Sequence, residues 1–124
     1  MKRMKVVVFW SGVFIFLTFS AVAVSGVSTM AETKKGRSAQ LERGRAVYTE
    51  NCGRCHGSDG QGHTRMAEIV EPPNMSDAAW QRGRSTSRMI ASVTNGRGQM
   101  PAFKKKLSKQ DIAASVAYVR TFKR

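Results

Sequence analysis

The chain has 124 residues, of which 41% are hydrophobic, 8% aromatic and 23% charged; 21 Lys and Arg against 8 Asp and Glu give a formal net charge of +13. This length accommodates one domain rather than two, and the ordinary apolar fraction excludes an intrinsically disordered chain. Two cysteines are too few for a framework of several disulfides or for a tetrathiolate zinc site.

The first 31 residues have the pattern of an export signal. They begin with three basic residues and no acid, and an apolar run of 19 residues over 6–24 follows. Small residues then lead to Ala31, and cleavage of a signal peptide over 1–31 would leave Glu32 as the first residue; Ala21-Val22-Ala23 is a weaker site. The alternative is an uncleaved membrane anchor, because about 20 apolar residues span a bilayer. Both interpretations place the rest of the chain outside the cytoplasm, in the periplasm or another exported location.

Residues 32–38 are polar, and we expect them to form a flexible lead-in to a single domain over 39–124. Apolar and small residues then recur every three or four positions, which predicts a helix over about 39–51. The residues on that face are Leu41, Gly44, Tyr48 and Cys52. The stretch over 57–74 is rich in Gly, Ser, Asp, Asn and Pro, so we expect a loop there.

Capping residues predict three further helices. Ser76 can cap a short one, and Ser85 or Thr86 the next. Ser108 followed three residues later by Asp111 resembles a capping box at the start of the last helix. The predicted inward faces consist of Met89, Ile90 and Val93 in one helix and of Ile112, Val116 and Val119 in the last. Since no stretch of the mature region alternates with period two for long enough to predict a sheet, the fold class is all-α, with three to five helices.

The most informative segment is Cys52-Gly53-Arg54-Cys55-His56. Two thiols three positions apart, followed at once by His, are the attachment signature of a c-type haem. The thiols of Cys52 and Cys55 can add to the two vinyl groups at one edge of the porphyrin, and the imidazole of His56 can then lie beneath the ring and reach the iron. Covalent attachment keeps the cofactor in place even in a small domain.

Three other interpretations of the motif stay open at this point. A thioredoxin-like redox dithiol would require a βαβ pattern nearby, and none is predicted. Half of a zinc site would require a second pair of ligands at a suitable spacing. A structural disulfide between the two cysteines is compatible with export.

Haem iron takes a second axial ligand, and a thioether suits electron transfer because it raises the reduction potential. The candidates are Met66, Met75, Met89, Met100 and His63. Met100 is favoured because two glycines and Pro101 restrict its loop, and because 44 residues separate it from His56. A helical methionine such as Met89 is expected to fill the core.

With these motifs in this order, the sequence resembles the class I c-type cytochromes, which are small monohaem electron carriers. The resemblance covers nearly all of the domain: a first helix, the attachment motif, a proline-containing loop, a methionine loop and a terminal helix. It implies one haem c with iron, attached through Cys52 and Cys55. It also implies that His56 and Met100 are the two iron ligands.

The resemblance assigns supporting roles as well. It implies that the carbonyl of Pro73 accepts a hydrogen bond from the other nitrogen of the ligand imidazole, which would orient the ring. It places Gly44 where the first and last helices cross closely, so a larger side chain would overpack the contact; the alternative is a weak point in an exposed helix. Trp80 lies either near a haem propionate, as in some relatives, or in the core. The loop over 57–71 has no feature that we assign to a partner.

The charge points to the kind of partner. Without residues 1–31 the chain keeps 18 basic and 8 acidic groups, a net charge of +10. Lys104, Lys105 and Lys106 follow the methionine loop, so we expect a positive field there that steers an acidic redox protein to the site. Anionic lipid headgroups are a second expected surface. We expect no nucleic-acid partner for an exported protein, and we expect a monomer.

Two functions are compatible with these residues. The first is a mobile carrier that shuttles one electron between redox partners. The alternative is a cytochrome c subunit bound tightly to a periplasmic or membrane oxidoreductase complex. Because both axial positions would be filled by the protein, we expect no enzyme activity and assign no catalytic residue. A peroxidase or gas sensor would require Met100 to leave the iron, and no distal base is evident.

Overall fold

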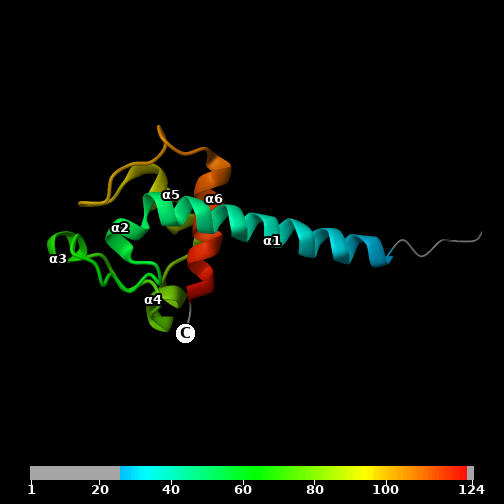
Figure 1. Cartoon of the computed structure of the whole chain (residues 1–124), viewed down its shortest axis with the longest axis horizontal. Helices are drawn as coiled ribbons and strands as arrows, with labels where there is room; N and C mark the ends of the chain where they lie inside the picture. Colours follow the sequence, from blue (N-terminus) through cyan, green and yellow to red (C-terminus); the bar gives the residue numbers. More distant parts are fainter. Residues whose placement is uncertain (1–25, 123–124) are drawn as a thin grey trace, which may run out of the picture.

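The structure is a computed structural model that describes residues 26–122, with side chains from Thr33 onward. Its elements in chain order are α1 (Gly26–Asn51), α2 (Gly53–His56), α3 (Ala67–Val70), α4 (Ala78–Gly83), α5 (Thr86–Asn95), α6 (Lys109–Val119) and the 3₁₀ turn η1 (Arg120–Phe122). Within these residues there is no strand, and the predicted all-α class is confirmed (Figure 1). The six α-helices of the described residues exceed the predicted three to five, because α2 and α3 are four-residue helices too short to show a helical spacing in the sequence.

Helix α6 holds the bundle together. It packs against both α1 and α5, while α2 follows α1 directly and packs against the short α3. Figure 1 shows α1 crossing α6 and then projecting away from the bundle on one side. The attachment motif, at the end of α1 and in α2, therefore lies on the packed side of the molecule.

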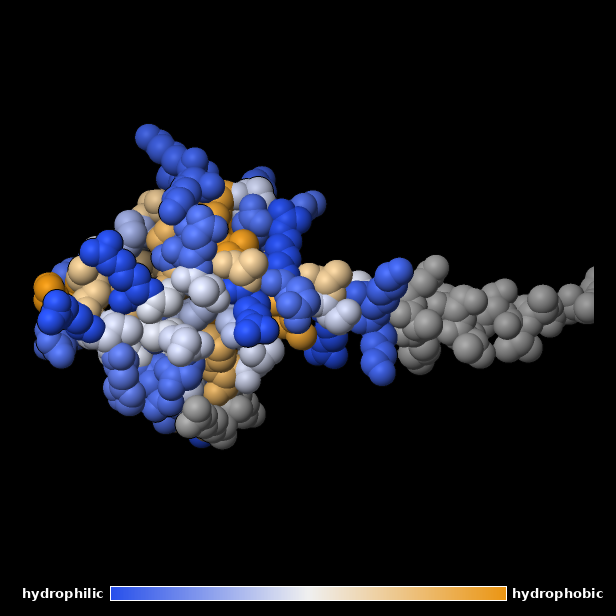
Figure 2. Space-filling view, in the orientation of Figure 1, coloured by the Kyte–Doolittle hydropathy of each residue, from blue (hydrophilic) through white to orange (hydrophobic). Residues whose placement is uncertain are grey.

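The first helix is longer than predicted. The helix expected over 39–51 begins at Gly26, and the lead-in over 32–38, expected to be flexible, is part of it. Side chains over 33–40 are exposed, and Figure 2 shows mainly hydrophilic side chains along this part of α1. The stretch contains no proline and many good helix formers. Its helical conformation follows from the helix propensity of its residues. The spacing of apolar residues, on which the prediction was based, reveals only the part of the helix that packs against the bundle.

The apolar run over 6–24, predicted as an export signal or anchor, lies outside the described residues. The cleavage site predicted after Ala31 falls where the backbone is helical. Of the helices in the described part of the chain, none is both long enough and apolar enough to cross a membrane.

The segment between the attachment motif and α5 departs from prediction in two places. The loop expected over 57–74 contains one helical turn, α3. Helix α4 is capped by Asp77, whose carboxylate accepts a hydrogen bond from the backbone N–H of Trp80 at 2.7 Å. The predicted cap, Ser76, is buried, and its hydroxyl donates instead to the side-chain oxygen of Asn74 at 2.8 Å. Because the Ser76 hydroxyl is engaged in this bond, it does not cap α4.

Helices α5 and α6 begin as predicted. The hydroxyl of Ser85 accepts from the backbone N–H of Arg88 at 3.2 Å. Ser108 and Asp111 form a reciprocal capping box, with the Ser108 hydroxyl accepting from the Asp111 N–H at 3.1 Å. The predicted inward residues of the last helix, Ile112, Val116 and Val119, are all buried.

The crossing of α1 and α6 is too close for a side chain at Gly44. A Cβ atom added there would overlap the carbonyl oxygen of Ala114 and would lie 3.0 Å from the Cβ of Tyr118. Gly44 is buried, so the alternative of a weak point in an exposed helix does not apply. The glycine lets the two backbones touch.

Aromatic rings fill the space beside that crossing. Tyr48 is 1% exposed and meets Tyr118 and Phe122 edge-on, with ring centroids 5.5 and 5.1 Å away. Tyr118 and Phe122 meet each other at 5.1 Å. Such edge-to-face pairs contribute beyond simple burial, and they tie α1 to the end of the chain.

A buried amide joins α4 to the end of α6. The side-chain nitrogen of Gln81 donates to the carbonyls of Met75 at 2.7 Å and Val119 at 3.0 Å. The guanidinium of Arg120 donates in turn to the Gln81 carbonyl at 2.8 Å. These bonds fix α4 and the residues before it against the bundle.

Two glycines of α1 provide a matched test of the crossing. We expect Gly44→Ala to destabilise the protein by about 1–3 kcal/mol, because the helices must separate. Gly36→Ala should instead stabilise it by about 0.5–1 kcal/mol, because no atom lies within 4 Å of the added Cβ and alanine favours the helix. Urea unfolding followed by circular dichroism measures both. Equal effects at the two positions would contradict the close crossing.

One ion pair also spans α1 and α6. Arg43 Nε donates to Asp111 Oδ1 at 2.7 Å, and the Ser108 hydroxyl donates to Oδ2 at 2.6 Å. The hydrogen bond from Arg43, followed by that from Ser108, lowers the pKa of Asp111 from 3.8 to about 2. The folded state therefore favours the ionised carboxyl.

This shift sets a pH dependence. A pKa that is lower in the folded chain contributes stability above about pH 4 that is lost as the pH falls towards 2. We expect Arg43→Ala to lower Tm at neutral pH and the difference from the wild type to fall to a small fraction of that value near pH 2. Thermal unfolding across this range measures it, with Arg45→Ala, exposed on the same helix, as the control. A difference of undiminished size at pH 2 would refute the assignment.

Candidate cofactor site

The attachment motif folds into a single turn. Cys52 lies between α1 and α2, and its carbonyl accepts from the backbone N–H groups of Cys55 at 3.1 Å and His56 at 3.0 Å. Both cysteines are half-buried and free, so no disulfide joins them. The turn brings two thiols and one imidazole close together at the end of a long helix.

The chain that follows the imidazole is held from three directions. The buried hydroxyl of Tyr48 donates to the carbonyl of Gly57 at 2.7 Å. The carbonyl of His56 accepts from the N–H of Gly62 at 2.8 Å, and the carbonyl of Cys55 accepts from the hydroxyl of Thr64 at 3.2 Å. These bonds restrict the backbone on both sides of the imidazole.

A tight turn presents Met100. Arg97 and Met100 exchange both backbone hydrogen bonds at 3.0 Å. Gly96, at φ +79°, starts the turn, and a Cβ there would lie 2.8 Å from the Met100 carbonyl oxygen. The far side of the turn is tied to α5, because the N–H of Phe103 donates to the carbonyl of Val93 at 2.9 Å. The predicted bent loop is therefore present and anchored.

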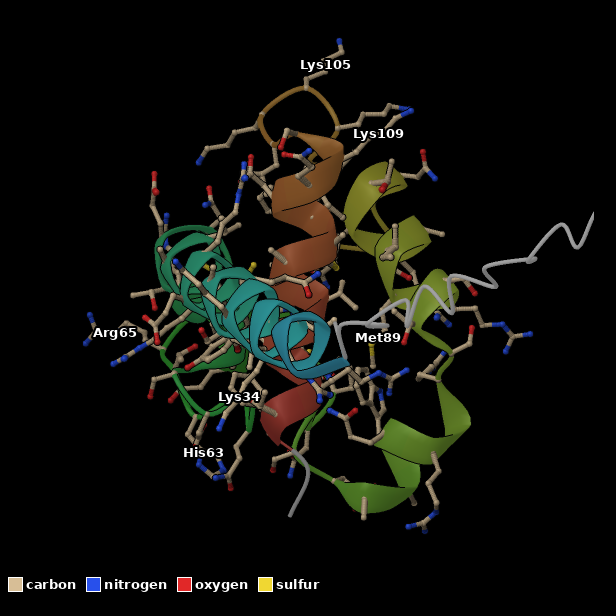
Figure 3. All side chains as sticks on the ribbon, turned by 90° about the vertical axis from the view of Figure 1, so that its right-hand side faces the viewer. Lys34, His63, Arg65, Met89, Lys105 and Lys109 are labelled. Carbon is tan, nitrogen blue, oxygen red and sulfur yellow. The ribbon has the colours of Figure 1, made fainter. Side chains whose placement is uncertain are left out.

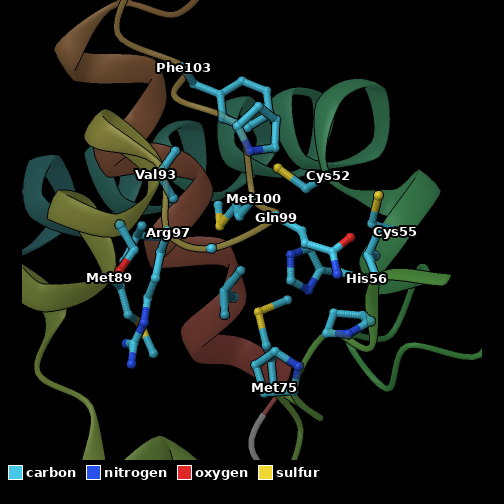
Figure 4. A pocket seen from close by; sticks show the side chains of 18 of the residues that line it. Cys52, Cys55, His56, Met75, Met89, Val93, Arg97, Gln99, Met100 and Phe103 are labelled. Carbon is cyan, nitrogen blue, oxygen red and sulfur yellow. The ribbon is translucent and has the colours of Figure 1, made fainter. Parts of the chain in front are cut away.

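These segments enclose a cavity of about 550 Å³. All five predicted site residues line it: Cys52, Cys55, His56, Pro73 and Met100. Figure 4 shows the two cysteines and the imidazole on one side, with Met100 across from them. Most of the remaining wall is apolar and includes Val70, Met75, Met89, Val93, Phe103, Val116 and Val119.

The other candidate ligands divide into two groups. Met75 and Met89 line the cavity and are 7% and 8% exposed, and the buried position expected for Met89 is found. Met66 and His63 do not contribute to the wall. His63 is exposed at the edge of the molecule (Figure 3). Three thioethers, but only the imidazole of His56, therefore face the cavity.

Burial sets the protonation of the motif. It lowers the pKa of His56, so the imidazole is neutral at neutral pH and keeps a lone pair for a metal. Its Nδ1 atom is buried and has no hydrogen-bond partner among the described residues. Pro73 lies on the same wall, but its predicted bond to the imidazole is not formed in this structure and stays a prediction. Burial, and then the charge of Cys55, raise the pKa of the Cys52 thiol to about 11.

Several wall residues were not predicted as such. Trp80, for which two roles were open, both lines the cavity and packs against the core cluster around Tyr48. Its Nε1 is buried and has no hydrogen-bond partner in the part of the chain that the structure describes. Arg88 lies on the cavity face of α5. The spacing of Arg88, Met89, Ser92 and Val93 is the helical signal that could have placed it there.

These features fit a large, flat, mostly apolar cofactor held at one edge. The two thiols can anchor it, and the unpartnered imidazole and the thioethers can bind its metal. The alternatives lose support. The cysteines are not bonded to each other, the described residues contain no βαβ unit, and within them no group of three or more His, Cys, Asp and Glu could hold a metal ion.

Residues 39–119 match the protein family described as cytochrome C oxidase, cbb3-type, subunit III. The cbb3-type cytochrome c oxidase subunit CcoP of Azospirillum brasilense is 37% identical over 82 residues, which cover 65% of this chain and 28% of that protein. The subunit FixP of Azorhizobium caulinodans is 30% identical over 96 residues, which cover 77% of this chain and 31% of that protein. The chain thus spans less than a third of the length of these relatives.

Solved structures are similar over the same region. The KustC0563 c-type cytochrome has a TM-score of 0.62 and 35% sequence identity, and the match covers 65% of this chain and 98% of that one. Cytochrome CL from Methylophaga aminisulfidivorans MPT has a TM-score of 0.55 at 20% identity, with 67% and 53% of the chains covered. The second likeness concerns the fold alone.

Proposed function

We propose a function from the premise that the chain belongs to the family of cytochrome C oxidase, cbb3-type, subunit III. It is a class I c-type cytochrome, and its cofactor is covalently bound haem c. When bound, the haem supplies a one-electron couple between Fe(II) and Fe(III). The proposed function is one-electron transfer as the cytochrome c subunit of an oxidase complex, outside the cytoplasm.

The residues on the cavity wall have different proposed roles in binding the haem. Cys52 and Cys55 attach it through thioether bonds. His56 binds the iron through its neutral imidazole, and Met100 binds from across the cavity. The carbonyl of Pro73 is the proposed acceptor for the second imidazole nitrogen, which would fix the ring plane and strengthen the ligand. The observation that carries this assignment is that all five residues, which come from three separate segments of the sequence, line one cavity.

This arrangement supports electron transfer rather than catalysis by the chain itself. Because His56 and Met100 would both hold the iron, no coordination site would be left for a substrate. The opposite wall offers apolar side chains and arginines but no imidazole or other base that could relay protons. The oxidation or reduction of a substrate would then fall to a partner that exchanges electrons with this domain.

The bound-subunit interpretation is favoured over a free carrier. Both the CcoP and FixP relatives are named as subunits of an oxidase, and the matched region is one part of each. The export signal predicted over 1–31 agrees with a haem domain that works outside the cytoplasm. If that segment stays attached as an anchor, the domain is tethered beside its partner.

The basic end of the bundle is the proposed docking surface for the acidic partner. We name it the basic tip and define it as Lys104, Lys105, Lys106 and Lys109. Figure 3 shows Lys105 and Lys109 projecting at the end where α6 begins. The charge of Lys106 partly opposes the rise in the pKa of the Cys52 thiol, so the basic tip adjoins the cysteine edge of the cavity. An acidic protein docked there would approach the attached edge of the haem.

Two of the three cavity methionines provide a test of the axial ligand. We expect Met100→Leu to abolish the weak red thioether-to-iron absorption of the ferric protein, because the sulfur is removed. Met89→Leu, at a buried methionine of α5 that also lines the cavity, should keep the band. Pyridine haemochrome spectra confirm equal haem content in both. If the band persisted in Met100→Leu and was lost in Met89→Leu, Met89 rather than Met100 would be the iron ligand.

Purification of the full chain tests the subunit role and the basic tip together. At low salt, we expect the tagged wild type to elute with an oxidase complex in mild detergent. Reversing the charges of Lys104, Lys105 and Lys106 to Glu should reduce the bound fraction roughly tenfold. Reversing Lys34, Lys35 and Arg37 on exposed α1 makes the same charge change and should have little effect.

The outcomes separate the alternatives. A wild type that elutes alone at every salt concentration would establish the free carrier. Equal losses in the two charge-reversed variants would show that net charge, rather than the basic tip, guides binding.

A further inference from the structure

Gln81 is a buried polar side chain that does not itself line the cavity. It is 5% exposed and lies on α4, directly after Trp80. Its Nε2 atom donates two hydrogen bonds, to the carbonyls of Met75 at 2.7 Å and Val119 at 3.0 Å. Its Oε1 atom accepts a third, from the guanidinium of Arg120 at 2.9 Å. Both N–H donors and the oxygen of the amide are therefore in use.

These three contacts suit one orientation of the amide. If its nitrogen and oxygen exchanged places, the oxygen would face two carbonyl oxygens and the nitrogen would face a guanidinium. All three hydrogen bonds would then be lost. Because a buried polar group without a partner costs free energy, the network holds the Gln81 side chain in a single conformation.

The two carbonyls that Gln81 binds belong to different parts of the cavity wall. The Val119 carbonyl is at the end of α6, and the last carbonyls of a helix have no partner within it. The Met75 carbonyl belongs to the loop that precedes α4. Both Met75 and Val119 line the cavity, so Gln81 joins two parts of the wall from behind.

The loop segment that contains Met75 is also fixed by other bonds. The N–H of Met75 donates to the carbonyl of Gly60 at 2.7 Å, in the loop that follows the attachment motif. The side-chain oxygen of Asn74 accepts from the N–H of Ser76 at 2.9 Å. These two bonds tie the segment to the neighbouring loop and to itself, whereas the bond from Gln81 ties it to α4 and α6.

This segment faces the imidazole of His56. Pro73 and Met75 line the cavity together with His56, and Figure 4 shows the Met75 thioether pointing towards the imidazole. The carbonyl of Pro73 is the proposed acceptor for His56 Nδ1, which is buried without a partner among the described residues. A hydrogen bond weakens steeply as its distance and angle depart from the optimum. The position of the segment therefore decides how strong that bond can be.

We propose that Gln81 is a positioning residue, which holds the Met75 carbonyl, keeps the segment over 73–75 beside His56 and so fixes the hydrogen bond of the ligand imidazole. This rests on the proposed function, in which His56 binds the iron and Pro73 accepts from its second nitrogen. A firmly held acceptor makes the imidazole a stronger electron donor, which favours the ferric state. Loosening the segment should therefore raise the midpoint potential.

The test compares two substitutions at buried residues of the holoprotein. Gln81→Met keeps the approximate length of the side chain but removes its amide, so the Met75 carbonyl loses its donor. Ser115→Ala removes a different buried hydrogen bond, from the Ser115 hydroxyl to the carbonyl of Ile112 at 2.8 Å within α6. The second variant is the control for a general loss of stability.

We expect Gln81→Met to speed hydrogen exchange at His56 Nδ1–H and at the Met75 N–H roughly tenfold, and to raise the midpoint potential. Ser115→Ala should lower Tm but leave the potential and the relative exchange rates unchanged. NMR of the ¹⁵N-labelled ferrous protein measures exchange, and a redox titration measures the potential. The rates are taken relative to amides inside α5, so that a general loss of stability, which speeds both, cancels.

Other results would overturn the positioning role. An unchanged relative rate at His56 Nδ1–H in Gln81→Met, with full haem content and an unchanged circular dichroism spectrum, would do so and leave the proposed function intact. A midpoint potential that stays the same or falls would also do so. Equal changes in Gln81→Met and Ser115→Ala would show that lost stability explains both.

A second variant keeps the test decisive if Gln81→Met does not fold. In Gln81→Glu the carboxylate can still accept from Arg120 but cannot donate to Met75, so exchange at His56 Nδ1–H should again rise, and an unchanged rate would overturn the role. Only exchange is compared for this variant, because its added negative charge itself lowers the potential. A wild-type chain that binds no haem c would overturn the proposed function itself, as the pyridine haemochrome spectrum would show first.

Discussion

The close crossing of α1 and α6 at Gly44 is the constraint on which the site depends. Because Gly44 has no side chain, the α1 backbone rests on the carbonyl of Ala114. One turn later, Tyr48 packs in the core against Tyr118, and its hydroxyl donates a hydrogen bond to the carbonyl of Gly57. One contact between helices therefore sets the frame of the bundle and also holds the chain that follows the attachment motif.

The sequence predicted best where the chemistry is local. The capping box of Ser108 and Asp111 and the attachment motif each lie within a few residues, and both are found as expected. The failures have tertiary or competing causes. Residues 32–38 are helical without a buried face, so amphipathic spacing could not reveal them, and Ser76 lost its capping role to a bond with a neighbour. Arg88 lines the cavity because of how α5 packs against α6, and no local sequence pattern predicts that packing.

The three cavity methionines differ in how the chain holds them. Met89 lies on a helix. Met75 lies in a loop, where its backbone N–H donates to the carbonyl of Gly60 at 2.7 Å. Both side chains are nearly fully buried. Met100 is half-buried on a turn closed by its own pair of hydrogen bonds. A turn of this kind keeps its shape without support from the cavity wall, so it can place a thioether against a metal. The buried pair instead gives the wall its bulk.

The excess of positive charge is divided between two settings with different physical consequences. The basic tip is exposed, so its field is screened within about 8–10 Å at moderate ionic strength and acts mainly on the rate at which an acidic partner arrives. Arg84 lines the cavity and is half-buried, so its charge is screened less than those of the basic tip and acts more directly on the site. Salt should therefore alter partner association far more than the midpoint potential. A single net charge read from composition cannot separate these effects, because they depend on which side chains the fold turns towards the cavity.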